Sequence, residues 1–230
     1  MTEQELKRYQ AVQNAARRTL DEVTEFIRPG ISEIDLVKKC DELQRAAGID
    51  SYWYQSLPAL ALIGDRTTLA ISRMPYAPDN IRAKENDLVT IDLNPAISGY
   101  CGDCARSYYI EDGETRRIPR RNAEFLQGAE AQKLLHALLK RTAHPDLTFN
   151  DLHQTLHEEI ERLGFEQLDY LGHSIGKETD QLVFIAPGSN CLLGETGLFT
   201  LEPHLRLKQS NYGFKHENIY YFKGQALHEL

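Results

Sequence analysis

Four acidic residues occupy apolar or aromatic segments of this sequence, where an unpaired charge is unfavourable. Asp92 lies inside LVTIDL, Glu202 inside LFTLEP and Glu217 inside FKHENIYYF. Asp103 follows Asp92 across a turn that contains Pro and Gly. If the segments on either side of that turn form a hairpin, the two aspartates come close together. Two like charges on a half-buried sheet are costly unless a cation joins them, so the pattern predicts a cation site.

His173, in the segment YLGHSIG, is a fifth candidate ligand, and the glycines beside it suit a tight backbone next to a ligand. Four carboxylates and one imidazole form a mostly oxygen donor set. Such a set suits Mn²⁺, Fe²⁺, Co²⁺ or Zn²⁺ better than a structural zinc, which prefers Cys and His. Four carboxylates are too many for one small divalent ion, whereas two ions that share bridging carboxylates balance the charge. We therefore expect two divalent metal ions.

The helices that must support these residues follow a repeated pattern. An apolar stripe predicts a first helix over 9–27, and a second helix over 32–48 begins at a Ser cap and ends at Gly. The segment P-x-I-S-x-x-D-L of the second helix recurs as P-x-L-T-x-x-D-L at an offset of 116 residues, which predicts a matching helix over 148–164. We interpret this as an internal duplication with halves of approximately 1–115 and 116–230.

Short apolar or β-branched runs predict strands over 60–63, 67–72, 88–93 and 106–110. Each half of the duplication supplies two carboxylates from adjacent strands. Two such halves are expected to pack about a pseudo-two-fold axis, with a site at their interface that takes ligands from both. Because no linker separates the halves, we expect a single domain over 1–230.

Composition narrows the function classes. The chain has 230 residues, 41% of them hydrophobic, and a net charge of −8. This balance excludes a mainly disordered chain, and the acidic charge without a Lys/Arg stripe argues against a nucleic-acid partner. No apolar run approaches the roughly 20 residues of a membrane span, and the N-terminus lacks an apolar signal segment. We therefore expect a cytoplasmic protein with no membrane partner.

The five motifs together resemble those of the pita-bread metallopeptidases: methionine aminopeptidases, prolidases, aminopeptidases P and their relative creatinase. The family pattern appears here, in order, as I-D-L, C-G-D, G-H-S-I-G, L-E-P and K-H-E, and the first two acids are eleven residues apart as in the family. The resemblance implies an α+β pita-bread fold, with two pseudo-symmetric helix–helix–strand halves around a central curved antiparallel sheet. The length resembles the short form, which lacks an N-terminal extension domain.

The resemblance also implies roles for individual residues. Asp103 and Glu217 would bridge two metals, Asp92 would complete one of them, and His173 and Glu202 would complete the other. A bridging water would be the nucleophile, and Glu202 would accept its proton as general base. The substrate would be a short peptide or another small molecule, and a homodimer is a family-level expectation.

The sequence departs from the family at two auxiliary histidines of the active peptidases. The first should lie upstream of the first Asp, where this chain has Met74 and Pro75, and the second should lie where it has Asp180. All eight histidines fall at position 136 or later, so the first half holds no substitute. An auxiliary donor at an oxyanion contributes roughly 10²–10³ in rate, so other groups must replace them in an ordinary peptidase.

Several residues are candidates for this replacement. His204 and Lys215 are each two residues from a predicted ligand, so on a strand they share its side. Each has an ordinary alternative, as a partly exposed His or a solvated strand residue. Tyr76, Tyr100 and Asp180 are further options.

The aromatic segment Ser51–Gln55 contains the only Trp of the chain, Trp53, followed by Tyr54. One interpretation is an aromatic wall that binds an amine or a peptide N-terminus. The other is aromatic packing under a loop.

Three functions remain open at this point. The intact ligand set favours a dinuclear metal-dependent hydrolase, resembling aminopeptidases, that cleaves a short peptide or small amide. The absent histidines favour an atypical metal-dependent enzyme on the same fold, acting on a small amine or amino-acid derivative. The third is a non-catalytic binding protein.

Overall fold

Two of the four long helices lie where local sequence signals place them, the second and the fourth, whereas the first spans residues 3–23 instead of the predicted 9–27. The computed structural model describes residues 1–230 and contains α1 (Glu3–Val23), α2 (Glu33–Ala46), α3 (Ala123–Thr142) and α4 (Phe149–Arg162). Ser32 and Asp35 cap α2 reciprocally, because each side chain accepts a hydrogen bond from the backbone N–H of the other. Thr148 caps α4, which starts (149 − 33) and ends (162 − 46) 116 residues after α2.

All strand pairs are antiparallel, and they form four small sheets with the orders β2-β3-β6-β7, β1-β4-β5, β11-β10-β8 and β13-β12-β9. The strands are β1 (Ser51–Tyr52), β2 (Leu60–Ile63), β3 (Asp87–Leu93), β4 (Pro95–Ile97), β5 (Tyr100–Cys101), β6 (Cys104–Glu111), β7 (Glu114–Arg116), β8 (Phe165–Gln167), β9 (Phe199–Leu201), β10 (His204–Leu207), β11 (Gly213–Lys215), β12 (Asn218–Lys223) and β13 (Ala226–Glu229). The predicted hairpin is confirmed: β3 pairs with β6, Asp92 faces Ala105, and β4 and β5 are inserted in the turn.

The strand predicted over 67–72 is wrong. This segment contains two short 3₁₀ helices, η2 (Gly64–Thr68) and η3 (Ile71–Arg73). The hydroxyls of Thr67 and Thr68 donate to the carbonyls three residues before them. Such local side-chain bonds favour tight turns over an extended strand. Two other 3₁₀ helices are η1 (Thr24–Phe26), which continues α1, and η4 (Leu193–Glu195).

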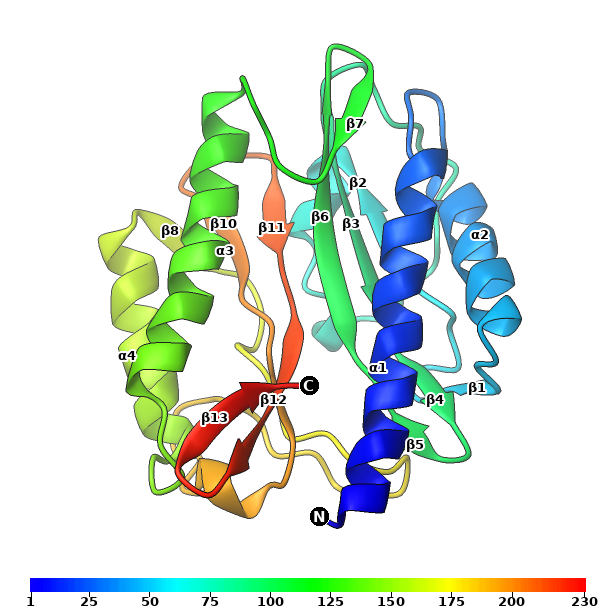
Figure 1. Cartoon of the computed structure of the whole chain (residues 1–230). Helices are drawn as coiled ribbons and strands as arrows, with labels where there is room; N and C mark the ends of the chain where they lie inside the picture. Colours follow the sequence, from blue (N-terminus) through cyan, green and yellow to red (C-terminus); the bar gives the residue numbers. More distant parts are fainter.

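The two halves meet in the middle of the molecule, where β6 runs beside β11 between the α1–α2 and α3–α4 helix pairs (Figure 1). The Glu217 N–H donates to the Ala105 carbonyl at 3.0 Å. The Ser107 hydroxyl donates to the Lys215 carbonyl and accepts from the Lys215 N–H, each at 2.9 Å. These bonds hold the strands of the two halves in a defined register.

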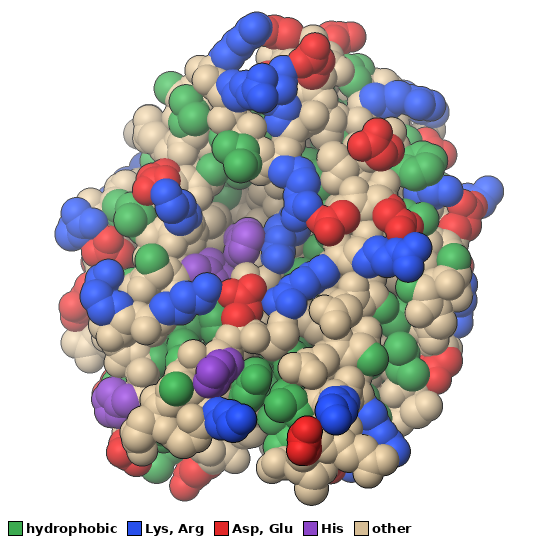
Figure 2. Space-filling view, in the orientation of Figure 1, with side chains coloured by type: hydrophobic (Ala, Val, Ile, Leu, Met, Phe, Trp, Pro, Cys, Tyr) green, Lys and Arg blue, Asp and Glu red, His purple; other side chains and the backbone are tan.

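The apolar core consists of several clusters. One contains Leu36 and Ile91 of the first half, a larger one contains Phe125 and Phe199 of the second half, and a third contains residues of both halves, among them Ile219. None of the helices combines the length and apolarity that crossing a bilayer requires. Figure 2 shows Lys and Arg side chains interspersed with Asp and Glu over the face that carries α1 and α3.

Candidate metal centre

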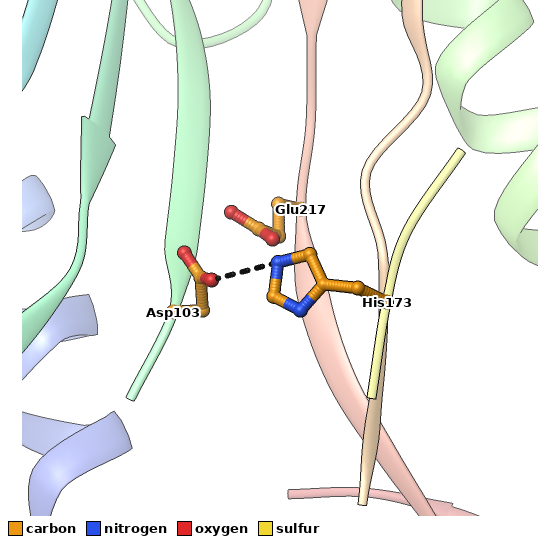
Figure 3. A group of neighbouring side chains, drawn as sticks. All are labelled: Asp103, His173 and Glu217. Atoms are coloured by element: carbon orange, nitrogen blue, oxygen red, sulfur yellow. Dashed lines mark ion pairs between the residues drawn. The ribbon is translucent and has the colours of Figure 1, made fainter. Parts of the chain in front are cut away.

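Three of the predicted ligands converge at the junction of the halves (Figure 3). Asp103 immediately precedes β6, Glu217 immediately precedes β12, and His173 lies in the irregular segment between β8 and β9. One ligand atom from each lies within 4.8 Å of the others. The Nε2 atom of His173 is 3.4 Å from Oδ2 of Asp103. All three side chains are buried, so this group forms a compact, mostly anionic pocket for a cation.

A second group shares one residue with the first. Asp92, Glu202 and Glu217 also place one carboxylate oxygen each within 4.8 Å of the others. The groups are in contact, because Nε2 of His173 lies 3.3 Å from Oε1 of Glu202. The structure thus brings all five predicted ligands together, in two overlapping sets that have Glu217 in common.

The tautomer of His173 follows from its hydrogen bond. Its Nδ1 atom lies 2.8 Å from the Ser174 carbonyl, which can only accept, so Nδ1 carries the proton. In the neutral ring, the Nε2 lone pair then faces the Asp103 and Glu202 carboxylates. The ring nitrogen and the two carboxyl groups therefore converge on one position, which is the arrangement that a bound cation requires. A ligating His usually has its other ring nitrogen bound in this way.

The backbone around His173 requires a glycine before it. The His173 N–H donates to the Thr200 hydroxyl, and the Thr200 N–H donates to the His173 carbonyl at 2.8 Å. A Cβ at Gly172 would lie 2.2 Å from the Thr200 carbonyl oxygen, and its φ is +148°. Only glycine allows the two segments to approach this closely.

Asp103 is held from the opposite side by Gln13 of α1. The Gln13 amide donates to the Asp103 carbonyl at 2.6 Å and accepts from the Asp103 N–H at 3.0 Å. Gln13 is fully buried, so this pair of bonds fixes the backbone of a candidate ligand.

The chemistry of these residues fits divalent ions. Both carboxylate oxygens of Glu217 are buried and have no hydrogen-bond partner in the protein. Burial raises the pKa of Asp103, and the nearby Asp92 and Glu202 raise it further. Burial likewise raises the pKa of Glu217, followed by the effect of Asp103. Unpartnered buried carboxyls with raised pKa values are groups that bound cations would stabilise.

Lys215 places a positive charge beside the second set of ligands. Its Nζ atom contacts the Asp92 carboxylate and lies 2.9 Å from Oε2 of Glu202. Burial alone would lower the pKa of Lys215, but the carboxylates of Asp92, Glu202 and Glu217 outweigh it and raise the pKa well above its usual value. Lys215 is therefore an ammonium, and it neutralises part of the acidic cluster.

His204 lies opposite Lys215 in the β10–β11 register. Its Nε2 donates to the Thr67 carbonyl at 2.7 Å, which leaves Nδ1 as an acceptor. Burial, together with the positive charge of Lys215, lowers the pKa of His204 to about 4. The ring is therefore neutral at pH 7. A Cβ at Gly213 would lie 2.8 Å from this ring, so the glycine makes room for it.

A cavity of about 230 Å³ opens onto the candidate ligands. Trp53, Tyr54, His204 and Lys215 all line it, together with Asp92, Asp103, His173 and Glu202. Its remaining walls are mostly apolar: Leu60, Leu62, Leu69, Ile71, Leu182 and Phe184. The indole N–H of Trp53 donates to the Gly102 carbonyl at 2.9 Å, and its ring packs edge-on against His173 with centroids 5.6 Å apart. This contact fixes one wall beside the ligands.

The structure places three other predicted residues away from the cavity lining. The Tyr76 hydroxyl donates to the Ala61 carbonyl and accepts from the Ala61 N–H, so Tyr76 braces β2. Asp180 is exposed and accepts from the Lys177 N–H at 2.7 Å. The Tyr100 hydroxyl accepts from Arg8. Neither Tyr76 nor Asp180 lines this cavity, and their part in substrate binding stays a prediction.

Sequence reasoning missed three polar residues that matter here. Asn94 and Asp169 line the cavity, and Gln13 positions Asp103. A signal for Asn94 was available, because Thr90, Asp92 and Asn94 alternate along the chain and all three line the cavity. A polar residue within the apolar stripe of α1 was the corresponding signal for Gln13.

Comparison with known proteins identifies the family. The model of metallopeptidase family M24 matches residues 7–223, so the chain belongs to this family. It is 27% identical over 212 residues to a methionine aminopeptidase of Chlamydia pneumoniae, covering 89% of this chain and 69% of the relative. It is 24% identical over 212 residues to the uncharacterized peptidase YqhT of Bacillus subtilis strain 168, covering 90% of this chain. The chain spans only 46% and 55% of the length of two Bacillus subtilis relatives.

Solved structures show the same fold. The X-Pro aminopeptidase from Thermotoga maritima MSB8 superposes with a TM-score of 0.83 at 20% identity, covering 100% of this chain and 61% of that one. The prolidase from Pyrococcus furiosus gives a TM-score of 0.80 at 22% identity, covering 99% of this chain and 64% of that one. The predicted α+β pita-bread fold is confirmed.

Proposed function

We propose that this protein is a dinuclear metal-dependent hydrolase that cleaves a short peptide or a small amide. The observation that carries the proposal is the pair of ligand sets sharing Glu217, with His173 presenting a lone pair between Asp103 and Glu202. Membership of a metallopeptidase family supports it. The ions implied are Mn²⁺, Fe²⁺, Co²⁺ or Zn²⁺, since the same donor set accepts each of them.

Different residues of the chain would bind the metal ions and transfer the proton. Asp103 and Glu217 would be shared by two ions, with Asp92 completing one site and His173 and Glu202 the other; the contacts of His173 with both Asp103 and Glu202 support this division. Bound divalent ions supply an activated water and polarise the scissile carbonyl. Glu202 would accept the proton of the attacking water, and the Lys215 ammonium lies 2.9 Å from its Oε2 atom.

Lys215 would also place a positive charge near the oxyanion that forms during hydrolysis. It is our candidate for the oxyanion stabilisation that the absent histidines would otherwise provide. His204, held neutral with Nδ1 as an acceptor, would orient a donor group of the substrate. Trp53 and Tyr54 would form the wall of the substrate site, and the leucines around them suit an apolar side chain.

A second candidate function rests on the missing histidines. Met74 and Pro75 stand where the first is expected, and the Asp180 that replaces the second lies outside the cavity lining. These changes favour a reaction on a small amine or amino-acid derivative over hydrolysis of an ordinary peptide.

Hydrolysis of a peptide panel by the metal-free protein, reloaded in turn with each of the four ions, tests the proposal. Met-first, Leu-first and Xaa-Pro peptides lead the panel. Asp103→Asn should abolish turnover, whereas Asp146→Asn makes the same chemical change at an exposed position and should leave it intact. Metal-dependent cleavage lost only in Asp103→Asn supports a peptidase. If the loaded wild type cleaves no peptide, the second candidate takes its place.

A further inference from the structure

Asn94 is a buried amide without a partner. Its side chain lies in the cavity wall, and the residue is 2% exposed. Neither Oδ1 nor Nδ2 has a hydrogen-bond partner in the protein. Buried polar groups are nearly always hydrogen-bonded, so a buried amide facing a cavity with both atoms free points to a ligand.

Other buried amides of this chain behave differently. Gln13 uses both its oxygen and its nitrogen on Asp103. The Gln44 nitrogen donates to two carbonyls, and so does the Gln132 nitrogen, so each lacks a partner only for its oxygen. Each of these buried amides thus has at least one hydrogen-bonded atom, whereas the Asn94 amide has none.

The position of Asn94 is fixed by its neighbours. Its carbonyl accepts from the Trp53 N–H at 3.1 Å, and the following Pro95 pairs with Tyr52 in the β1–β4 ladder. Asn94 also follows Asp92 by two residues, and both line the cavity. The main chain at Asn94 is therefore held in place, and the residue lines the same cavity as a candidate metal ligand.

An amide of this kind matches the main chain of an extended residue. In an extended chain, the N–H and C=O of one residue point to the same side, as in the doubly bonded pairs of an antiparallel ladder. One Asn side chain can accept from that nitrogen and donate to that oxygen. An isolated amine would use only Oδ1, and an isolated carbonyl only Nδ2.

We propose that Asn94 recognises the main chain of the substrate, with Oδ1 accepting from the amino group and Nδ2 donating to the carbonyl of one extended residue. This inference rests on the proposed function and specifies its substrate class. The substrate is an amino-acid amide or peptide whose amino group and carbonyl are both free to bind, with an apolar side chain directed to the leucine-lined wall.

Calorimetric binding to the metal-loaded protein tests this inference without requiring turnover. The probes are L-leucinamide, 4-methylpentanamide, which lacks the amino group, and 3-methylbutylamine, which lacks the carbonyl. The variants are Asn94→Leu, which keeps the approximate volume, and Asn94→Ala. Each variant should lower the affinity for L-leucinamide about fivefold more than the affinity for either analogue, because only L-leucinamide loses two hydrogen bonds.

Thermal unfolding separates recognition from a structural role. Asn94→Leu removes an unpartnered buried amide, so its unfolding midpoint in the absence of ligand should equal or exceed that of the wild type. Gln44→Leu breaks two bonds far from the cavity, so it should lower the midpoint while leaving L-leucinamide affinity unchanged.

Unchanged L-leucinamide affinity in both Asn94 variants would overturn the inference. Loss of affinity only together with loss of bound metal would overturn it as well. Peptide hydrolysis measured on the same preparations keeps the two proposals apart. Binding that depends on Asn94 without any hydrolysis would leave this inference standing and reject the peptidase. Hydrolysis with the same KM in wild type and Asn94→Leu would do the reverse.

Discussion

Replacing Gln13 by Leu should weaken metal binding from a position that touches no metal. Gln13 lies on α1, and its side-chain amide hydrogen-bonds with the backbone of Asp103 at 2.6 and 3.0 Å. The variant keeps a buried side chain of similar size and removes both bonds. The Asp103 N–H and C=O would then be buried without these partners.

The size of the effect follows from the two broken bonds. Leaving a buried polar group unpaired costs about 1–3 kcal/mol, so two such groups destabilise the metal-free protein by about 2–6 kcal/mol. For a chain of this size, this lowers the unfolding midpoint by about 5–20 °C. Because outer partners of a metal ligand typically contribute 10–100-fold to affinity, the dissociation constant for metal should rise by about that factor.

The assay is competitive metal titration with a chelating dye, with thermal unfolding measured in chelator. Gln44→Leu is the matched control, because Gln44 is also a fully buried amide that binds two backbone carbonyls, yet it lies away from the ligands. It should lower the midpoint and leave metal affinity unchanged. Wild-type metal affinity in Gln13→Leu would refute the idea that Gln13 positions Asp103.

Three further outcomes are expected. Lys215→Met breaks a buried contact with Asp92 and Glu202. Chemical unfolding should therefore show the metal-free protein destabilised by about 3–5 kcal/mol and the metal-loaded protein destabilised by less. An equal loss of stability in the two forms would contradict this. Gly172→Ala forces a Cβ against the Thr200 carbonyl, so it should cost at least about 1–3 kcal/mol and weaken metal binding; a wild-type midpoint would argue against the described backbone. Burial raises the pKa of Asp103 and Glu217 in the folded metal-free protein. The folded state therefore holds protons that the unfolded chain releases. The stability of the metal-free protein should fall as pH rises through the folded pKa values. Metal must displace these protons, so metal affinity should rise with pH and calorimetry in different buffers should show proton release; pH-independent affinity would contradict the raised values.

The candidate ligands could be predicted because they break a local rule. Acids inside apolar strands conflict with the pattern expected of a core, and such conflicts mark functional positions. The cap residues Ser32 and Thr148 predicted the starts of two helices, because helix capping depends on residues close in sequence.

Features that depend on contacts between distant segments were not predictable in this way. The 3₁₀ turn at Thr67 was missed for a local reason, because its hydroxyl donates to the Gly64 carbonyl three residues earlier and a β-branched run does not reveal this bond. The bonds between Tyr76 and Ala61 are visible only in the folded chain. Gln13 and Asn94 gain their meaning only when α1, β3 and the aromatic segment are packed together.

The location of bound metal tests the central claim most directly. Crystals of the protein grown with Mn²⁺ and measured for anomalous scattering would show where each ion binds. Two anomalous peaks are expected beside Asp103 and Glu217, one next to Asp92 and the other next to His173 and Glu202, and both should disappear or weaken in Asp103→Asn because Asp103 is shared. No peak at these residues in crystals saturated with the ion would contradict the account.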